Sequence, residues 1–274
     1  MRWEGRQTSS NIEDRRRLSP GVKVGGGLGI VAALVGLFLG VDINGLLGGG
    51  GGTPTEGAPR SPEEDRQAEF VSVVLADTEV TWTKLLGDRY QKPKLVLFSE
   101  NVDSACGFQS KATGPFYCPA DRKAYLDLSF FADLDQRFGA PGDFARAYVI
   151  AHEVGHHIQN LLGTSTQVHQ RKKGLPAAEA NALSVRLELQ ADCYSGVWAH
   201  HAHRERQLLE PGDLEEGLRA AAAIGDDRLQ KMSKGTVRPE SWTHGSSAQR
   251  VKWFKQGFES GQWNVCDTFA VAAP

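Results

Sequence analysis

AHEVGH, at residues 151–156, is the stretch from which the interpretation of this chain starts. Its apolar surroundings predict a buried helix, and two histidines four residues apart, His152 and His156, lie on one face of such a helix. Their ring nitrogens can converge on one metal ion. Glu153, about a third of a turn away, can reach a water on that metal without occupying the metal itself. An exposed helix with two ordinary histidines is the alternative, which the apolar surroundings disfavour because unpaired buried charges are costly.

A second, later helix carries two acidic residues one turn apart, Glu188 and Asp192. Catalytic zinc takes three protein ligands and keeps one open position. We therefore predict that His152, His156 and Glu188 hold one Zn²⁺ ion per chain. Asp192, on the same face as Glu188, can accept a hydrogen bond from the outer ring N–H of a histidine ligand and fix its tautomer. A solvated acidic face is the alternative, and the largely apolar character of this helix disfavours it.

His244 lies in a loop directly before a predicted helix, and we expect it to donate a hydrogen bond to the oxyanion of a tetrahedral intermediate. A simple surface histidine is the other interpretation. Tyr148 and Tyr125 are weaker candidates for the same role and fit core positions better. The predicted strand Lys123–Leu128 is either an edge strand that pairs with an extended peptide or an internal, fully paired strand.

The other histidines fit structural or solvated positions. His157 is about 100° around the helix from its neighbouring ligand, so we expect it beside the site or at the surface. His200, His201 and His203 are near a helix end and are expected to be solvated or to interact with its dipole. His169 is flanked by basic residues and is expected to be exposed.

Four cysteines are too few for a disulfide-based scaffold, and no C-x-x-C spacing is present. Cys106 and Cys118 bracket a short loop that a bridge would hold. Cys193 and Cys266 can form a second bridge that ties the C-terminal region to the Glu188 helix. Two bridges require an oxidising compartment outside the cytoplasm.

The N-terminal part of the chain divides into three segments. Residues 1–24 are polar and basic, residues 25–47 contain an apolar run of about 17 residues without a charge, and residues 48–60 are a Gly- and Pro-rich linker. A cleaved signal peptide and a buried core helix explain the apolar run less well than one uncleaved membrane anchor. We expect a single-pass protein with a cytoplasmic N-terminus and a periplasmic or extracellular domain at residues 61–274.

For the whole domain, we expect an α+β fold that is rich in helices and has a small β-sheet. The charge is nearly balanced, with 31 basic and 33 acidic residues, so nucleic acid is not an expected partner. Strands are predicted at Leu95–Phe98 and Lys123–Leu128, with a loop or hairpin at Cys106–Cys118. Helices are predicted from Pro62 after the cap Ser61, at about Ser129–Phe138, from Phe144 to Leu162 with Asp143 as cap and Gly163 as stop, from near Pro176 past Trp198, from Pro211 to about Met232, and from Ser246 or Ser247 to about Gly261.

The two motifs together resemble the gluzincin class of zinc peptidases. More closely, the chain resembles the bacterial family of neutral zinc metallopeptidases known as YpfJ-like proteins. The matching stretches are MRWEGR at residues 1–6 with Asn11 to Arg16, FYCPAD at 116–121, YLD at 125–127, the two zinc motifs, and WTHGSS at 242–247. The resemblance implies a zincin-like domain in a membrane-tethered peptidase that acts on peptide or protein substrates.

These features predict hydrolysis of peptide bonds by a zinc-activated water, with Glu153 as the general base. Two other functions use the same residues. One is a non-catalytic, membrane-tethered scaffold with a retained zinc site, which would require a fourth protein ligand such as His157 or His244. The other is a zinc amidohydrolase that acts on a non-protein amide, for example in a cell wall.

Overall fold

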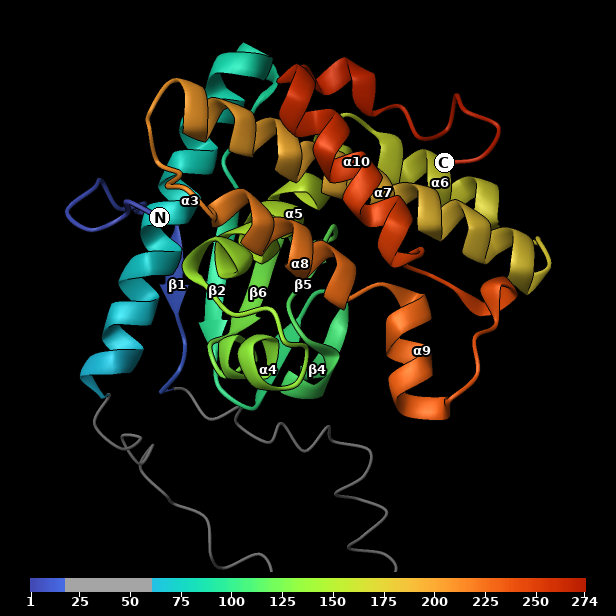
Figure 1. The fold of residues 1–274 in the computed structure, drawn as a ribbon, viewed down its shortest axis with the longest axis horizontal. Coiled ribbons are helices and arrows are strands. Elements are labelled where there is room, and N and C mark those ends of the chain that lie inside the picture. Colours follow the sequence, from blue (N-terminus) through green and yellow to red (C-terminus); the bar gives the residue numbers. More distant parts are fainter. Residues whose placement is uncertain (18–60) are drawn as a thin grey trace, which may run out of the picture.

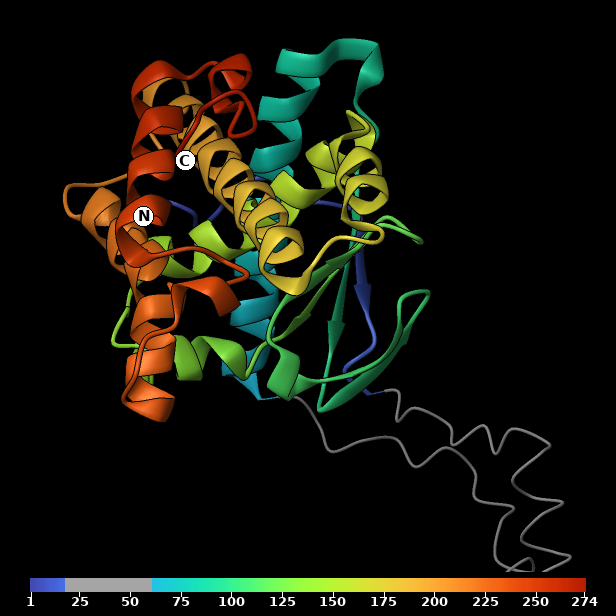
Figure 2. The ribbon, with the colours of Figure 1, turned by 90° about the vertical axis from the view of Figure 1, so that its right-hand side faces the viewer.

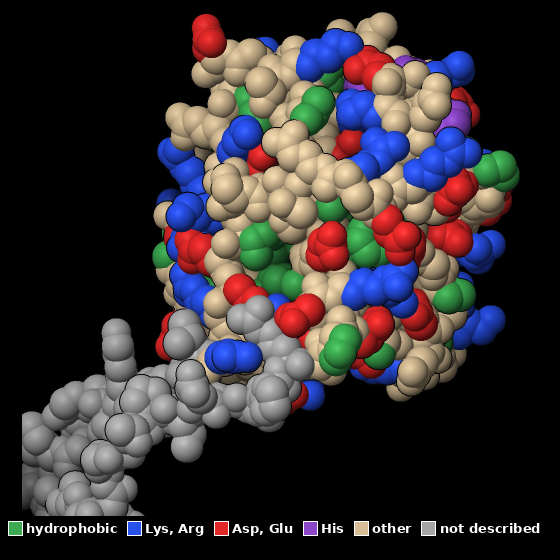
Figure 3. Space-filling view, turned by 90° about the vertical axis from the view of Figure 1, so that its left-hand side faces the viewer, with side chains coloured by type: hydrophobic (Ala, Val, Ile, Leu, Met, Phe, Trp, Pro, Cys, Tyr) green, Lys and Arg blue, Asp and Glu red, His purple; other side chains and the backbone are tan. Residues whose placement is uncertain are grey.

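The computed structural model describes residues 1–17 and 61–274 (Figure 1). Helices predominate, and a small sheet lies beside them, so the architecture is the helix-rich α+β type that the sequence predicts. Figure 2 shows the sheet on one side and the C-terminal helices on the other. One face of the molecule has Lys and Arg side chains interspersed with Asp and Glu, in keeping with the balanced charge (Figure 3).

The main sheet has four strands in the order β1-β2-β6-β5. β1 (Ile12–Asp14), β2 (Lys94–Phe98) and β6 (Lys123–Asp127) are parallel, and β5 (Phe116–Cys118) runs antiparallel to β6. The predicted strand at Lys123–Leu128 is therefore internal, and its possible role as an edge strand is corrected. Of the described strands, β5 forms the edge of the sheet next to β6.

A separate hairpin follows β2. It consists of β3 (Asn101–Ser104) and β4 (Gly107–Ser110), which pair antiparallel. The short 3-10 helix η2 (Lys111–Thr113) then leads into β5. The loop or hairpin expected between Cys106 and Cys118 therefore contains β4, η2 and β5.

The N-terminal residues belong to the same folded unit as the rest of the domain. β1 pairs with β2 over three residues, and the Trp3 ring is 5% exposed and packs edge-on against Phe70 at 5.3 Å between ring centroids. Trp3 Nε1 also donates a hydrogen bond to Asp143 Oδ2 at 2.9 Å. From the sequence, residues 1–24 were expected to form a cytoplasmic segment apart from the domain; the structure instead places residues 1–17 within it. Three residues of β1 are too short a pattern to be recognised from sequence alternation.

The helices largely follow the expected positions; the capping box predicted at Ser61 is formed, and a second capping box is present at Ser246. Asp143, predicted as a cap, is instead the first residue of its helix: Gly142 is at the N-cap position, and the Asp143 carboxylate accepts a hydrogen bond from the Trp3 indole. The helices are α3 (Pro62–Leu86), α4 (Phe130–Gln136), α5 (Asp143–Leu161), α6 (Thr164–Lys172), α7 (Ala177–Arg204), α8 (Asp213–Ala223), α9 (Asp226–Lys234) and α10 (Ser247–Ser260), with further 3-10 turns η1 (Gly87–Arg89), η3 (Pro239–Ser241) and η4 (Trp263–Cys266).

The structure divides one predicted helix in two and contains one helix that was not predicted. The single helix expected from Pro211 to about Met232 is divided into α8 and α9 at Gly225. A Cβ on Gly225 would lie 2.4 Å from the Ser247 backbone nitrogen, so the break lets this corner approach the start of α10. The left-handed residue Gly163 ends α5 as expected, but the chain immediately forms α6 instead of a loop.

Close contact between α5, α7 and α10 depends on glycine. A Cβ on Gly155, inside the first motif, would lie 2.9 Å from the carbonyl oxygen of Ala191 on α7. A Cβ on Gly257 of α10 would lie 2.0 Å from the Cys193 carbonyl oxygen. Since real Cβ atoms do not approach so closely, these glycines allow the three helices to meet backbone to backbone.

Both predicted disulfides are formed. Cys106–Cys118 joins the turn of the β3–β4 hairpin to the end of β5. Cys193–Cys266 joins α7 to η4 near the C-terminus. The first bridge links the edge strand β5 to the hairpin, and the second links α7, the helix that carries Glu188, to the C-terminal region.

Among the helices formed by residues 1–17 and 61–274, none combines the length and the apolar character needed to cross a bilayer. The membrane anchor expected at residues 25–47 and the linker expected at residues 48–60 lie outside the described residues. The predicted transmembrane helix therefore has no support from the described part of the fold.

Candidate metal centre

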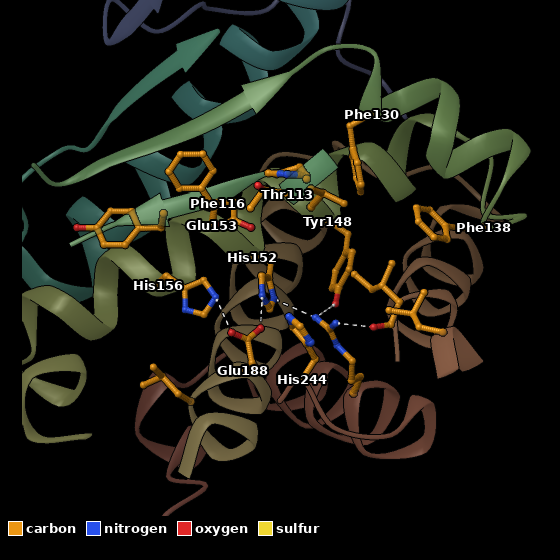
Figure 4. A pocket seen from close by; sticks show the side chains of 18 of the residues that line it. Thr113, Phe116, Phe130, Phe138, Tyr148, His152, Glu153, His156, Glu188 and His244 are labelled. Atoms are coloured by element: carbon orange, nitrogen blue, oxygen red, sulfur yellow. Dashed lines mark hydrogen bonds and ion pairs between the residues drawn. The ribbon is translucent and has the colours of Figure 1, made fainter. Parts of the chain in front are cut away.

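Three predicted ligands converge between α5 and α7. Nε2 of His152 lies 3.1 Å from Oε2 of Glu188, and Nε2 of His156 lies 3.4 Å from Oε1 of the same carboxylate (Figure 4). One potential ligand atom from each residue lies within 4.8 Å of the others. Two imidazole nitrogens and a carboxylate oxygen form the donor set of three-ligand catalytic zinc sites. In the described part of the chain, this is the group of three that could hold a metal ion.

Glu153 is buried beside these ligands and is only 8% exposed. Among the described residues, none provides a hydrogen-bond partner for its buried Oε2 atom. Burial raises the pKa of this carboxyl group above its ordinary value. An unpartnered, basic carboxylate at the edge of a ligand cluster is suited to receive a proton from a water held there.

Asp192 fixes the orientation of His152. Oδ1 of Asp192 accepts a hydrogen bond from Nδ1 of His152 at 2.9 Å, so Nε2 is the nitrogen left for a metal. The fully buried carboxylate also accepts hydrogen bonds from the Tyr148 hydroxyl and from Arg250. The predicted positions of Glu188 and Asp192, one turn apart on α7, thus place them against the same histidine.

Arg250 of α10 is the residue of this cluster that the sequence analysis missed. It is 1% exposed and binds both oxygens of Asp192, with Nε–Oδ2 at 2.8 Å and Nη2–Oδ1 at 2.9 Å. Burial alone would raise the pKa of Asp192, but Arg250 and His152 outweigh it and hold that pKa below its ordinary value. Arg250 also supplies a positive charge near the buried carboxylate of Glu153 and the half-buried carboxylate of Glu188. No local motif marks it, since it lies 58 residues from Asp192.

His156 is held by a chain of amides. Its Nδ1 lies 2.9 Å from Oε1 of Gln159, whose own Nε2 donates to the Leu187 carbonyl on α7 at 2.6 Å and to Gln190 Oε1 at 3.1 Å. Gln159 is fully buried. Both histidines are therefore held through Nδ1, which directs Nε2 of each toward Glu188. Gln159 was not predicted, although its position three residues after His156 on the same helix was a usable signal.

His244 borders the same cavity, from the loop between α9 and α10. Asp226, at the start of α9, accepts backbone N–H groups from residues 243, 244 and 245 and lies 3.2 Å from Nδ1 of His244. The hydrogen bond to Asp226 raises the pKa of His244 above its ordinary value. Asp226, another residue missed from the sequence, thus holds both the loop and the ring of His244, whose side chain is exposed at the border of the cavity.

The other aromatic and histidine candidates are placed away from the chemistry. The Tyr148 hydroxyl is engaged by Asp192 and Arg250, and Tyr125 is a core residue that donates to Asp121 at 2.6 Å. The remaining histidines fall into three environments. His157 is buried and bonded to β5 and to a backbone carbonyl, and His169 borders the cavity. His200, His201 and His203 lie at the end of α7, where His200 and His201 donate hydrogen bonds to backbone carbonyl oxygens.

His157 joins the metal-binding helix to the end strand. Its Nδ1 lies 3.0 Å from the Tyr117 hydroxyl on β5, and its Nε2 lies against the Gln91 carbonyl. Asn160 donates to the same hydroxyl at 3.0 Å. Burial lowers the pKa of His157 to about 4, which keeps the ring neutral. These bonds turn His157 away from the ligand cluster and toward β5.

The ligands line a cavity of about 710 Å³. One wall consists of α5, α7 and Arg250, and the opposite wall includes β5 and the segment of residues 111–115 before it. Figure 4 shows Phe116 near Glu153, with Phe130 and Phe138 on the Tyr148 side of the ligands. The cavity therefore gives an extended molecule access to the cluster.

Comparison with known proteins identifies the family. The sequence model of the family described as "Putative neutral zinc metallopeptidase" matches residues 1–269. The chain is 49% identical over 284 aligned residues to "Uncharacterized protein YpfJ" of Escherichia coli K12, covering 98% of this chain and 99% of that protein. It is 48% identical over 204 residues to "Uncharacterized protein Rv2575" of Mycobacterium tuberculosis H37Rv and to "Uncharacterized protein Mb2605" of Mycobacterium bovis, covering 71% of this chain and 68% of each relative.

No solved structure matches this chain. The family match nevertheless spans almost the whole sequence, including residues 1–17, from which Trp3 enters the core. The family implies zinc, and the cluster of His152, His156 and Glu188 offers it suitable ligands. The chain belongs to the neutral zinc metallopeptidase family, as the resemblance of its motifs predicted.

Proposed function

We propose that this protein is a membrane-tethered, zinc-dependent peptidase that hydrolyses peptide bonds. The observation that carries the proposal is the buried Oε2 of Glu153, which has no hydrogen-bond partner in the described part of the chain and lies beside three converging ligands. A cluster with three protein ligands leaves a coordination position for water, whereas structural zinc is closed by four. His157, one of two candidates for a fourth ligand, is bonded to Tyr117 and Gln91 instead. This arrangement favours catalysis over a scaffold with a retained zinc ion.

The residues divide the chemistry between them. His152, His156 and Glu188 would hold zinc, which when bound polarises a carbonyl group and lowers the pKa of water. Glu153 takes the proton of the attacking water and delivers it to the leaving amine. His244, held by Asp226 and carrying a raised pKa, donates a hydrogen bond to the oxyanion. Asp192 keeps His152 in the tautomer that presents Nε2.

β5 is the proposed binding edge for the peptide. It is the end strand on this side of the described sheet, and Phe116 and Tyr117 border the cavity. An extended peptide can pair with the open edge of such a strand through backbone hydrogen bonds. This assigns to β5 the role that the sequence analysis considered for the strand at Lys123–Leu128.

We also propose that the domain works outside the cytoplasm, in a periplasmic or extracellular setting. The two disulfides support this, because such bridges persist in oxidising compartments. The apolar run at residues 25–47 is the proposed point of membrane attachment. Free thiols at Cys106, Cys118, Cys193 and Cys266 in protein exported by its native route would refute the compartment assignment.

The experiment that tests the catalytic proposal compares the wild-type protein with Glu153→Gln. The variant keeps the size of the side chain and should bind about one zinc ion per chain, but it should lose hydrolysis of a mixed peptide library, because it has no carboxylate to accept the proton. Hydrolysis of the library by the Gln variant would show that Glu153 is not the general base. Zinc binding without peptide hydrolysis by wild type would favour a non-peptide amide or a scaffold.

A further inference from the structure

We propose that a second cavity, separated from the metal ligands by α6, binds an organic anion with an apolar body, and that this binding strengthens the hold of the chain on zinc. The cavity has a volume of about 500 Å³ and lies between α6, α7 and η4. Val168 lines both cavities, so they share a wall. Neighbouring faces of α6 serve the two: Ser165, His169 and Lys172 line the metal cavity, and Thr164, Gln167 and Arg171 line the second. The coupling rests on the metal site proposed above, whereas the ligand site does not.

The walls of the second cavity offer apolar surface on a fixed frame. Leu162, Trp263 and Phe269 line it and are each only half-buried. Leu162 and Trp263 pack against the main core. The disulfide from Cys266 to α7 fixes η4, which carries Trp263. A cavity that is formed in advance and lined by apolar and aromatic side chains suits a ligand with an apolar body.

The charges that line this cavity favour an anion. Arg89 and Arg171 contribute two guanidinium groups, which lie 5.4 Å from the ring centroid of Trp263 and 6.0 Å from that of Phe269. Within residues 1–17 and 61–274, no carboxylate pairs with either arginine. The acidic side chain at the border is Asp267, whose Oδ1 already accepts the backbone N–H groups of residues 269 and 270. Guanidinium groups that stack on aromatic rings and have no carboxylate partner are typical of sites for oxyanions.

Tyr194 supplies an independent sign of a ligand. Its side chain lines the cavity and is only 3% exposed, and its ring packs edge-on against Trp82 at 5.5 Å. No residue of the described ranges forms a hydrogen bond with its hydroxyl, although the oxygen is not sealed within the protein. Burial and the nearby Asp267 raise the pKa of Tyr194, which keeps the hydroxyl protonated as a donor. A donor in so buried a side chain is normally satisfied, so this one is free for a ligand oxygen.

A chain of hydrogen bonds connects the second cavity with the metal centre. Gln190 lines the cavity and is 5% exposed; its Nε2 donates to the Cys266 carbonyl at 2.9 Å. Its Oε1 accepts from Nε2 of Gln159 at 3.1 Å, and Oε1 of Gln159 lies 2.9 Å from Nδ1 of His156. A ligand that joins Arg171 to η4 would restrain Gln190 and, through Gln159, the His156 ring. Restraint of a ligand histidine in its binding orientation favours the metal-bound state.

The first experiment measures binding to the zinc-loaded full chain by calorimetric titration. The probes are 2-phenylethanesulfonate, which has both a ring and an oxyanion, ethanesulfonate, which lacks the ring, and 2-phenylethylamine, which has the opposite charge. The first probe should bind at least about tenfold more tightly than either of the others, because only it uses both the apolar wall and the guanidinium groups. Equal affinities, or displacement of the probe by acetohydroxamate bound to the zinc, would overturn the site.

Two variants locate the bound probe. Arg171→Glu should weaken binding of 2-phenylethanesulfonate at least about tenfold, since it replaces attraction by repulsion. Lys173→Glu makes the same change of charge at an exposed position outside the cavity and should alter binding less than about twofold. Tyr194→Phe should weaken binding about fivefold through loss of one hydrogen bond. Equal responses of the Arg171 and Lys173 variants would show that the probe binds elsewhere.

The coupling is tested by competition for zinc with a chelator, with and without saturating 2-phenylethanesulfonate. The probe should lower the Kd for zinc at least about fivefold, and zinc should tighten probe binding by the same factor. Gln159→Leu should still bind the probe but lose this effect, whereas Gln170→Leu, at an exposed position of α6, should keep it. Arg171→Glu should also lose it.

The outcomes separate the ligand site from the proposed function. An unchanged Kd for zinc in the probe-bound wild-type protein would overturn the coupling, and so would an undiminished effect in the Gln159 variant. A wild-type protein that binds the probe but no zinc would overturn the peptidase proposal and the coupling, and would leave the ligand site standing.

Discussion

The two walls of the cavity are held in place by different means. On the helical wall, Arg250, Asp192 and His152 form a buried, charge-assisted network joined to closely packed helices. On the opposite wall, β5 is held by its antiparallel pairing with β6, by neutral hydrogen bonds of the Tyr117 hydroxyl and by one disulfide. Buried charged groups are costly to disturb, whereas single neutral hydrogen bonds contribute about 1 kcal/mol. The comparison indicates that the metal wall is fixed and the substrate wall is the adjustable part of the site.

The largest expected effect is on the metal wall, from Glu188→Ala. With two histidines remaining, zinc content should fall from about one ion per chain to near zero after dialysis. Glu179→Ala is the control, because Glu179 is an exposed residue of the same helix. Metal analysis that finds full zinc occupancy in the Glu188 variant would remove Glu188 from the ligand set.

The next largest effect is expected from Arg250→Ala, because this change leaves Asp192 buried without its charged partner. We expect the free energy of unfolding to fall by about 3–5 kcal/mol in urea titrations of the zinc-free protein. Lys255→Ala, at an exposed position of α10, should change it by less than about 0.5 kcal/mol. If Arg250→Ala lowers the free energy of unfolding no more than Lys255→Ala does, the metal wall is not held by this buried charge network.

His244→Ala tests the loop next to the fixed wall. Loss of a hydrogen-bond donor to the oxyanion should lower kcat about 10²–10³-fold while zinc remains bound. The control is His203→Ala, at an exposed position near the end of α7, which should leave kcat unchanged. Full kcat in a zinc-loaded His244 variant would exclude it from the chemistry.

Tyr117→Phe should give the smallest effect and acts on the adjustable wall. Removing the hydroxyl leaves His157 and Asn160 without this partner, at a cost of about 1 kcal/mol of unfolding free energy. Because β5 is the proposed substrate edge, KM should rise several-fold with little change in kcat. The control is Tyr90→Phe, whose buried hydroxyl has no partner among the described residues. A change in kcat alone would argue against a role of β5 in substrate binding.

The parts of the site that were predictable are the parts encoded locally. The spacing of His152, His156 and Glu153, and of Glu188 and Asp192, follows from helix geometry and needs no knowledge of the tertiary fold. The disulfide pairs were also predicted and are formed. Helical periodicity and capping signals gave most helices their correct type and place.

What sequence could not supply depends on contacts between distant segments. Arg250 and Asp226 act on residues in other elements, and neither lies in a pattern that marks it. The break at Gly225 arises from close approach to Ser247, which a helical propensity does not report. The order of the strands determines that β5, and not the predicted strand Lys123–Leu128, is at the end of the sheet.

The pairing of β1 with β2 has a consequence for topology. Asp14 and Trp3 belong to the same folded domain as the metal centre. Arg16 donates a hydrogen bond to the Glu64 carbonyl at 2.9 Å, so the residues on either side of the interval 18–60 lie next to each other. A single passage through a bilayer between them would put β1 and its sheet in different compartments. An attachment to the membrane that preserves this fold must therefore begin and end on the side where the metal centre lies.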